Sequence, residues 1–147
     1  MMDLLTVEQI ALGAKADSKE EAIKLAGELL VNNGVVEPAY IEGMLLREQT
    51  MSTYLGNGVA IPHGTYDHLG DINRTGISVL QLPDGIEWEE GEVAHLIIGI
   101  AANSDEHIGV LSNLAEVMED ESTVEMLAKT EDPQIILDLL NKQPELE

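Results

Sequence analysis

The sequence predicts an α/β fold: a single-domain sandwich built on a mixed sheet of about five strands, with helices on both faces. Segments with helical periodicity alternate with short apolar segments rich in β-branched residues. One of these, residues 93–101, is apolar over nearly its whole length, as expected for a central strand covered on both faces. The 147 residues suffice for one sizeable core, and no repeat or linker interrupts them. We therefore expect one domain over residues 3–143.

Two helices are expected in the first third of the chain. Ser18 is a suitable N-cap with Glu21 three residues later, and apolar residues follow at helical spacing until Asn33-Gly34 ends the helix. Pro38 suits the first turn of the second helix, where its missing N–H group costs nothing. Arg47 lies near the end of that helix, where the helix dipole favours a cation.

The middle of the chain contains the predicted strands. Residues 59–61 form a short buried strand, and residues 76–82 alternate apolar and polar side chains over part of their length. Residues 83–85 are expected to make a turn, and residues 86–88 a short strand at the edge of the sheet. Residues 93–101 follow as the central strand.

Three helices are expected after the central strand. Ser104 is the expected N-cap of the first, with His107 in its opening turn. Free N–H groups at such a helix start favour anions, although a histidine there is also compatible with a plain amphipathic turn. Ser122-Thr123 is expected to cap the second helix, and Asp132-Pro133 the third.

Composition limits the classes of protein that the chain can represent. It contains no cysteine, so disulfides, thiolate metal sites and cysteine nucleophiles are absent. No apolar run approaches the roughly 20 residues of a membrane helix, so we expect no insertion into a membrane. The first residues lack the basic and apolar regions of a secretory signal. We expect a cytoplasmic protein.

The net charge of −21 argues against nucleic acid and anionic membranes as partners. Such a charge suits a basic protein partner, which its field would steer during encounter. Solubility alone and adaptation to salt are alternative explanations. Glutamate (19 residues) outnumbers aspartate (9 residues), which favours exposed helical faces over salt adaptation.

The stretch of residues 52–64 organises the rest of the chain. Gly56 and Gly58 permit positive φ angles and a close approach of the backbone. Pro62 ends the strand that follows them, so His63 should be rigid on one side and open on the other. An imidazole in that setting titrates near neutral pH and can act as a base or a nucleophile. The alternative is an ordinary histidine in a surface turn.

This stretch resembles the active-site segment of enzyme IIA of the sugar phosphotransferase system, mannitol/fructose class, and the mannitol type within it. The matching residues are Leu55-Gly56-Asn57-Gly58-Val59-Ala60-Ile61-Pro62-His63-Gly64, with Arg47-Glu48 upstream and Ser52-Thr53 between. The resemblance continues through residues 20–23 and 105–107 and covers nearly the whole chain.

The resemblance implies roles for three residues. The family's histidine that matches His63 carries a phosphoryl group on Nε2, as a tele-phosphohistidine. Arg47 is expected beside it to stabilise the phosphoryl group, although an ordinary ion pair with Glu48 or Glu42 is its alternative. His107 is expected across the site in a supporting role. No metal or other cofactor is required.

The implied function is a phosphoryl relay, which would make the protein a phosphotransferase component. It would accept the group from phospho-HPr and pass it to a cysteine of the cognate enzyme IIB, which phosphorylates a sugar, mannitol by the wording of the sequence, during import. Two alternatives remain open: a regulatory module like the nitrogen-type enzymes IIA, and an interaction domain in which His63 is structural.

The other histidines of the described motifs have plainer interpretations. His68 lies in a polar loop, and no further ligand cluster supports a metal site with His63. His95 falls within the central strand, where we expect a hydrogen-bonded structural histidine.

Overall fold

The computed structural model describes residues 5–65, 70–102, 112 and 114–140. Its helices are η1, a 3-10 turn (Val7–Gln9), α1 (Lys19–Asn32), α2 (Ala39–Thr50), α4 (Glu121–Lys129) and α5 (Pro133–Leu140). Its strands are β1 (Ile10–Ala11), β2 (Tyr54–Gly56), β3 (Val59–Ala60), β4 (Gly76–Glu89) and β5 (Glu92–Ala101). Ser112 and residues 114–118 are also helical and precede α4.

The five strands form one mixed sheet in the order β1-β4-β5-β3-β2. β1 runs parallel to β4, and β3 runs parallel to β5. The β4–β5 and β2–β3 pairs are antiparallel. β5 therefore lies in the middle of the sheet, as its apolar sequence predicts, and the expected mixed sheet of about five strands is confirmed.

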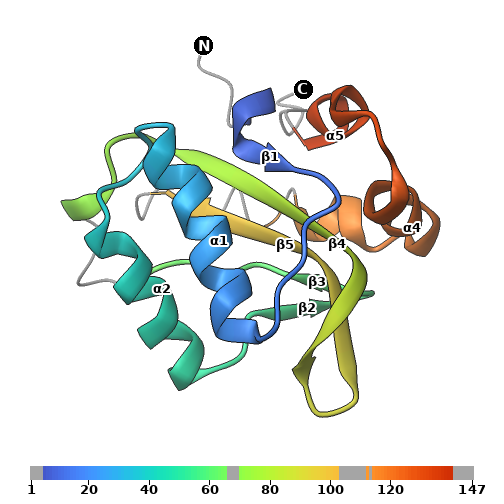
Figure 1. The fold of residues 1–147 in the computed structure, drawn as a ribbon, viewed down its shortest axis with the longest axis horizontal. Coiled ribbons are helices and arrows are strands. Elements are labelled where there is room, and N and C mark those ends of the chain that lie inside the picture. The colour runs from blue at the N-terminus through green and yellow to red at the C-terminus, as the bar shows by residue number, and fades with distance from the viewer. Residues whose placement is uncertain (1–4, 66–69, 103–111, 113, 141–147) are drawn as a thin grey trace.

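Helices cover both faces of the sheet, as predicted (Figure 1). One core lies under α1 and α2, where Ile97 and Leu80 point from the sheet toward Ile23 and Met44. The other core lies under α4 and α5, where Leu96, Ile98 and Ile100 of β5 belong to the same apolar cluster as buried residues of these two helices. Consecutive residues of β5 thus point to opposite cores, because side chains alternate across a strand.

β4 is one continuous strand, so the predicted turn at residues 83–85 is wrong. Gln81 pairs with Leu96, and Ile86 pairs with Ala94, so four residues of β4 face a single residue of β5. The extra length forms a bulge in which Gly85 has a φ of 70°. Pairing resumes after the bulge because buried side chains, Trp88 among them, continue on β4.

The helix ends agree with the sequence at three of the four described caps that were predicted. The Ser18 side chain accepts a hydrogen bond from the Glu21 N–H group at 3.1 Å, and Asn33 and Gly34 end α1. Asp132 accepts from the Gln134 N–H group at 3.0 Å at the start of α5.

The predicted cap at Ser122-Thr123 is wrong. The cap of α4 is Asp120, whose carboxylate accepts hydrogen bonds from the N–H groups of both predicted residues. An aspartate two residues before Ser122 offers an acceptor and a negative charge to the helix start, so the helix begins at Glu121. The predicted helix start at Ser104 lies outside the described residues.

A membrane-spanning helix needs roughly 20 consecutive apolar residues. None of the described helices combines the length and the apolar character needed to cross a membrane.

Candidate functional site

A glycine-rich turn joins β2 to β3 at one end of the sheet. Gly56 and Gly58 have φ angles of 121° and 86°, and Asn57 between them has a φ of 54°. These positive angles are the ones that glycine and asparagine tolerate, as the sequence predicts. The Gly58 carbonyl accepts hydrogen bonds from the N–H groups of His95 and Leu96 at 2.7 and 3.1 Å, which fixes the turn against β5.

His63 lies just after β3, at the end of the central strand. It forms an isolated parallel bridge with Ile100, one residue before the end of β5. The Ile100 N–H group donates to the Pro62 carbonyl at 2.9 Å. His63 is half-buried, and its predicted position at a strand end agrees with the structure, whereas its predicted open side stays a prediction.

The His63 ring is oriented by its own strand. Nδ1 lies 2.9 Å from the carbonyl oxygen of Ile61. Because a carbonyl oxygen can only accept, Nδ1 must carry the hydrogen in this contact. The neutral imidazole then has its ring lone pair on Nε2, which makes Nε2 the nucleophilic nitrogen.

Tyr40 of α2 holds the other side of the His63 loop. Its hydroxyl group donates to the Ile100 carbonyl at 2.7 Å and accepts from the Gly64 N–H group at 2.9 Å. The side chain is buried, and burial raises the pKa of Tyr40 to about 12, although the hydrogen bond from Gly64 acts in the opposite direction. The hydroxyl group therefore stays protonated near neutral pH and keeps both bonds.

Gly64 is required by the same contact. A Cβ atom on Gly64 would lie 2.5 Å from Cε1 and 2.8 Å from Cζ of Tyr40, closer than side chains pack. In the sequence, Tyr40 has the place of an ordinary buried residue in the second predicted helix. Its hydroxyl group could have indicated a role in positioning the loop, because a buried tyrosine usually requires a hydrogen-bond partner.

Arg47 lies in the last turn of α2, as predicted. It is half-buried, and its Nη1 donates to the Met51 carbonyl at 2.6 Å. This contact caps the end of its own helix, so a role for Arg47 beside His63 stays a prediction. The adjacent Glu48 turns inward to other partners and does not supply the ion pair considered from the sequence.

The remaining histidines separate into two groups. His107 and His68 lie outside the described residues, so the predicted meeting of His107 with His63 is not tested. His95 lies on β5, where its Nδ1 donates to the Leu82 carbonyl at 3.1 Å and its ring packs close to Gly85. It is the hydrogen-bonded strand histidine that the sequence predicts.

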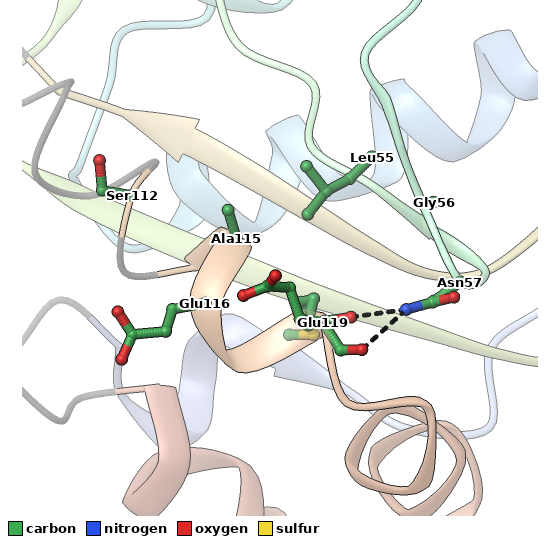
Figure 2. Close-up of a pocket in the computed structure, with 8 residues that line it drawn as sticks. Leu55, Gly56, Asn57, Ser112, Ala115, Glu116 and Glu119 are labelled. Carbon is green, nitrogen blue, oxygen red and sulfur yellow. Dashed lines mark hydrogen bonds between the residues drawn. The ribbon is translucent and has the colours of Figure 1, made fainter.

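A pocket of about 470 Å³ lies between the glycine-rich turn and the helical segment before α4 (Figure 2). The Asn57 amide donates to the carbonyl groups of Met118 and Glu119 at 2.9 and 3.4 Å and joins the two walls. The lining residues are Leu55, Gly56, Asn57, Ser112, Ala115, Glu116, Met118 and Glu119. His63 is not among them, so its ring lies outside this pocket.

Comparison with known proteins places this chain in a family. The family model described as "Phosphoenolpyruvate-dependent sugar phosphotransferase system, EIIA 2" matches residues 3–143. The chain is 45% identical over 141 residues to a mannitol-specific phosphotransferase enzyme IIA component of Geobacillus stearothermophilus, covering 96% of this chain and 97% of that protein.

Solved structures agree with this match. The complex of enzyme IIAMTL and phosphorylated enzyme IIBMTL from Escherichia coli contains a chain that superposes with a TM-score of 0.87 at 46% identity, covering 92% of this chain and 96% of that one. The nitrogen regulatory protein IIA-Ntr of Neisseria meningitidis superposes with a TM-score of 0.80 at 26% identity, covering 93% and 96%. On the extent of these matches, the chain belongs to the EIIA 2 family of the phosphoenolpyruvate-dependent sugar phosphotransferase system.

Proposed function

We propose that the protein is a phosphocarrier that accepts a phosphoryl group from phospho-HPr on Nε2 of His63. It then passes the group to a cysteine of the cognate enzyme IIB, for coupled uptake and phosphorylation of a sugar, with mannitol the favoured substrate. These steps make it a phosphotransferase component that works on the cytoplasmic side of a membrane transporter.

The observation that carries the proposal is the contact between Nδ1 of His63 and the Ile61 carbonyl. It selects the tautomer in which Nε2 bears the lone pair, so attack on phosphorus needs no prior proton transfer. As the bond between Nε2 and phosphorus forms and the bond from phosphorus to the donor breaks, the ring gains positive charge. The Ile61 carbonyl stabilises that charge through the Nδ1–H group.

The second step reverses the first with a different acceptor. The thiolate of the enzyme IIB cysteine attacks phosphorus, and the bond to Nε2 breaks, which returns His63 to its neutral tautomer. Little covalent chemistry falls to the rest of the protein, so its contribution is to position the ring and stabilise charge. Arg47, and His107 outside the described residues, are proposed to supply hydrogen bonds to the phosphoryl oxygens.

The relatives support the choice of partner and of sugar. The E. coli structure is a complex of an enzyme IIA with phosphorylated enzyme IIB, and the Geobacillus relative is mannitol-specific by name. HPr is proposed as the donor because the chain belongs to a family of the phosphotransferase system, and no contact in the structure bears on this choice. The nitrogen regulatory protein shares the fold at much lower identity, so transport is favoured over the regulatory alternative.

The test is incubation with enzyme I, HPr and phosphoenolpyruvate, followed by measurement of the intact mass. One acid-labile phosphoryl group is expected on the wild-type protein and none on His63→Ala. His95→Gln is the matched control, because His95 also donates from Nδ1 to a carbonyl group but lies on β5. Full labelling of His63→Ala would assign the phosphoryl group to another residue.

A further inference from the structure

Glu48 is a buried carboxylate that the proposed reaction does not use. It is 6% exposed and lies one residue after Arg47, near the end of α2. Its carboxylate accepts hydrogen bonds from the Thr53 N–H group at 3.0 Å, from the Thr53 hydroxyl group at 2.5 Å and from Trp88 Nε1 at 3.0 Å. A buried charge with this many donors holds its neighbours in fixed positions.

A continuous set of hydrogen bonds joins Glu48 to the reacting ring. The carboxylate holds Thr53 by both its backbone and its side chain. The Thr53 carbonyl accepts from the Ile61 N–H group at 3.0 Å, and the Ile61 carbonyl accepts from His63 Nδ1 at 2.9 Å. The bond to Thr53 thus fixes the position of Ile61, and the Ile61 carbonyl in turn orients the His63 ring.

Glu48 is itself fixed from its far side. Lys19 Nζ lies 3.7 Å from Oε2 of Glu48, 2.6 Å from a carboxylate oxygen of Glu89, and 5.9 Å from the ring centroid of Trp88. Lys19 comes from α1, whereas Trp88 and Glu89 come from β4. Two further elements therefore set the position of the carboxylate that holds Thr53.

We propose that Glu48 is a positioning residue for phosphoryl transfer at His63. It fixes Thr53 and, through it, the Ile61 carbonyl that selects the Nδ1–H tautomer and aims Nε2. This inference rests on the proposed function, since it assigns Glu48 a part in the same reaction. Small displacements of a reacting group are costly, with losses reaching about a hundredfold for 1 Å.

Glu48→Gln tests the inference with the least change of shape. Trp88 and the Thr53 N–H group donate to Oε2 of Glu48, whereas the Thr53 hydroxyl group donates to Oε1. An amide whose oxygen takes the Oε2 position places an NH2 group at Oε1, which cannot accept from the Thr53 hydroxyl group. Spectra that correlate ¹H and ¹⁵N in the His63 ring should show the Nδ1–H form in the wild type and a mixture of tautomers in the variant. Transfer at saturating phospho-HPr should slow by about tenfold, with an unchanged concentration for half-saturation.

Gln81→Leu is the matched control for lost stability. Gln81 is buried, and its amide donates to the carbonyl groups of Leu127 and Thr130 on the α4 side of the sheet. This variant should unfold more easily yet keep the wild-type ring spectrum and transfer rate. Thr53→Ser, which keeps the hydroxyl group, should stay near the wild type, whereas Thr53→Val should follow Glu48→Gln. If Glu48→Gln fails to fold, the Thr53 pair decides.

Two results would overturn the inference: a wild-type ring spectrum in Glu48→Gln and Thr53→Val, or an equal change in Gln81→Leu. Failure of the proposed function looks different, because the wild-type protein itself would then take no phosphoryl group on His63. In that case the ring spectra of the same variants still decide whether Glu48 positions the imidazole.

Discussion

The hydroxyl oxygen of Tyr40 lies 2.9 Å from the backbone nitrogen of Gly64, the residue directly after His63. The same hydroxyl group donates to the Ile100 carbonyl at 2.7 Å. One side chain of α2 therefore joins the His63 loop to the central strand, with a sequence separation of 24 residues between Tyr40 and Gly64 and of 60 between Tyr40 and Ile100. The conformation of the loop thus depends on contacts with the protein core as well as on its own residues.

Tyr40→Phe removes this link with no change in ring shape. The Gly64 N–H group and the Ile100 carbonyl both lose their partner, so we expect the free energy of unfolding to fall by about 1–3 kcal/mol. Urea titration measures it. Tyr54→Phe is the control, since the half-buried Tyr54 hydroxyl also bridges two backbone groups, Gly58 N–H and the Val93 carbonyl. An equal loss of unfolding free energy in both variants would show that the Tyr40 bridge stabilises the protein no more than the Tyr54 bridge does.

The pKa of Tyr40 predicts a loss of stability at high pH. Burial raises it from 10.0 to about 12, so between these values the unfolded chain releases the proton while the folded protein keeps it. The stabilisation is complete below about pH 10 and is lost as pH rises toward 12, at no more than about 1.4 kcal/mol per pH unit. Tyr40→Phe should lack this part of the slope. Parallel pH profiles of unfolding for the two proteins would contradict the assignment.

Gly64→Ala should disturb the site by steric conflict alone. The added methyl group would lie 2.5 Å from the Tyr40 ring, so the ring or the loop must move, at a cost of about 1–3 kcal/mol. Phosphoryl acceptance should slow together with the loss of stability. Gly70→Ala is the control, because no atom lies within 4 Å of its added Cβ. Thermal unfolding and transfer rates that match Gly70→Ala would show that the loop adapts freely.

Arg47→Lys keeps the positive charge but loses the planar guanidinium group that suits phosphoryl oxygens. Because its recorded contact is with the exposed end of α2, unfolding should change by less than about 0.5 kcal/mol while transfer slows. Arg74→Lys is the control: Arg74 donates to Gln9 and to the Asn33 carbonyl, so it should affect stability and not transfer. Wild-type transfer rates in both Arg47→Lys and Arg47→Ala would remove Arg47 from the site.

The net charge of −21 predicts that association with HPr slows as salt rises. The transfer step within the complex should change little, since groups that bond to the phosphoryl oxygens would lie well within the screening distance of about 8 Å. Stopped-flow transfer at several ionic strengths separates the two. A bimolecular rate that does not vary with salt would limit the charge to a role in solubility.

Local features of the sequence predict much of this fold and of the site. The apolar run of β5 predicts its central position, and the glycines at 56 and 58 predict the turn that precedes His63. Both follow from the conformations and burial that those residue types prefer, which need no knowledge of distant neighbours.

Features that depend on partners far along the chain were missed. From the sequence, Tyr40 is an ordinary core residue, because the partners of its hydroxyl group, the Ile100 carbonyl and the Gly64 N–H group, lie far along the chain. From the sequence, Glu48 is a candidate partner for Arg47 on the helix surface. In the structure its carboxylate is buried and accepts hydrogen bonds from Thr53 and from Trp88, which lies 40 residues further along the chain. The bulge at Gly85 reads as a turn, because only pairing with β5 shows that the strand resumes.

Both backbone groups of Ile100 support the loop that carries His63. Its N–H group donates to the Pro62 carbonyl, and its carbonyl accepts from the Tyr40 hydroxyl group of α2, which in turn accepts from the Gly64 N–H group. Ile100 is fully buried on the central strand, in the class of positions whose amides exchange with solvent only when the whole molecule unfolds. We therefore expect the Pro62 side of this loop to open only when the whole molecule unfolds. A distant destabilising mutation should then reduce the fraction of folded molecules while leaving the contacts of Pro62 and Gly64 intact in each folded molecule.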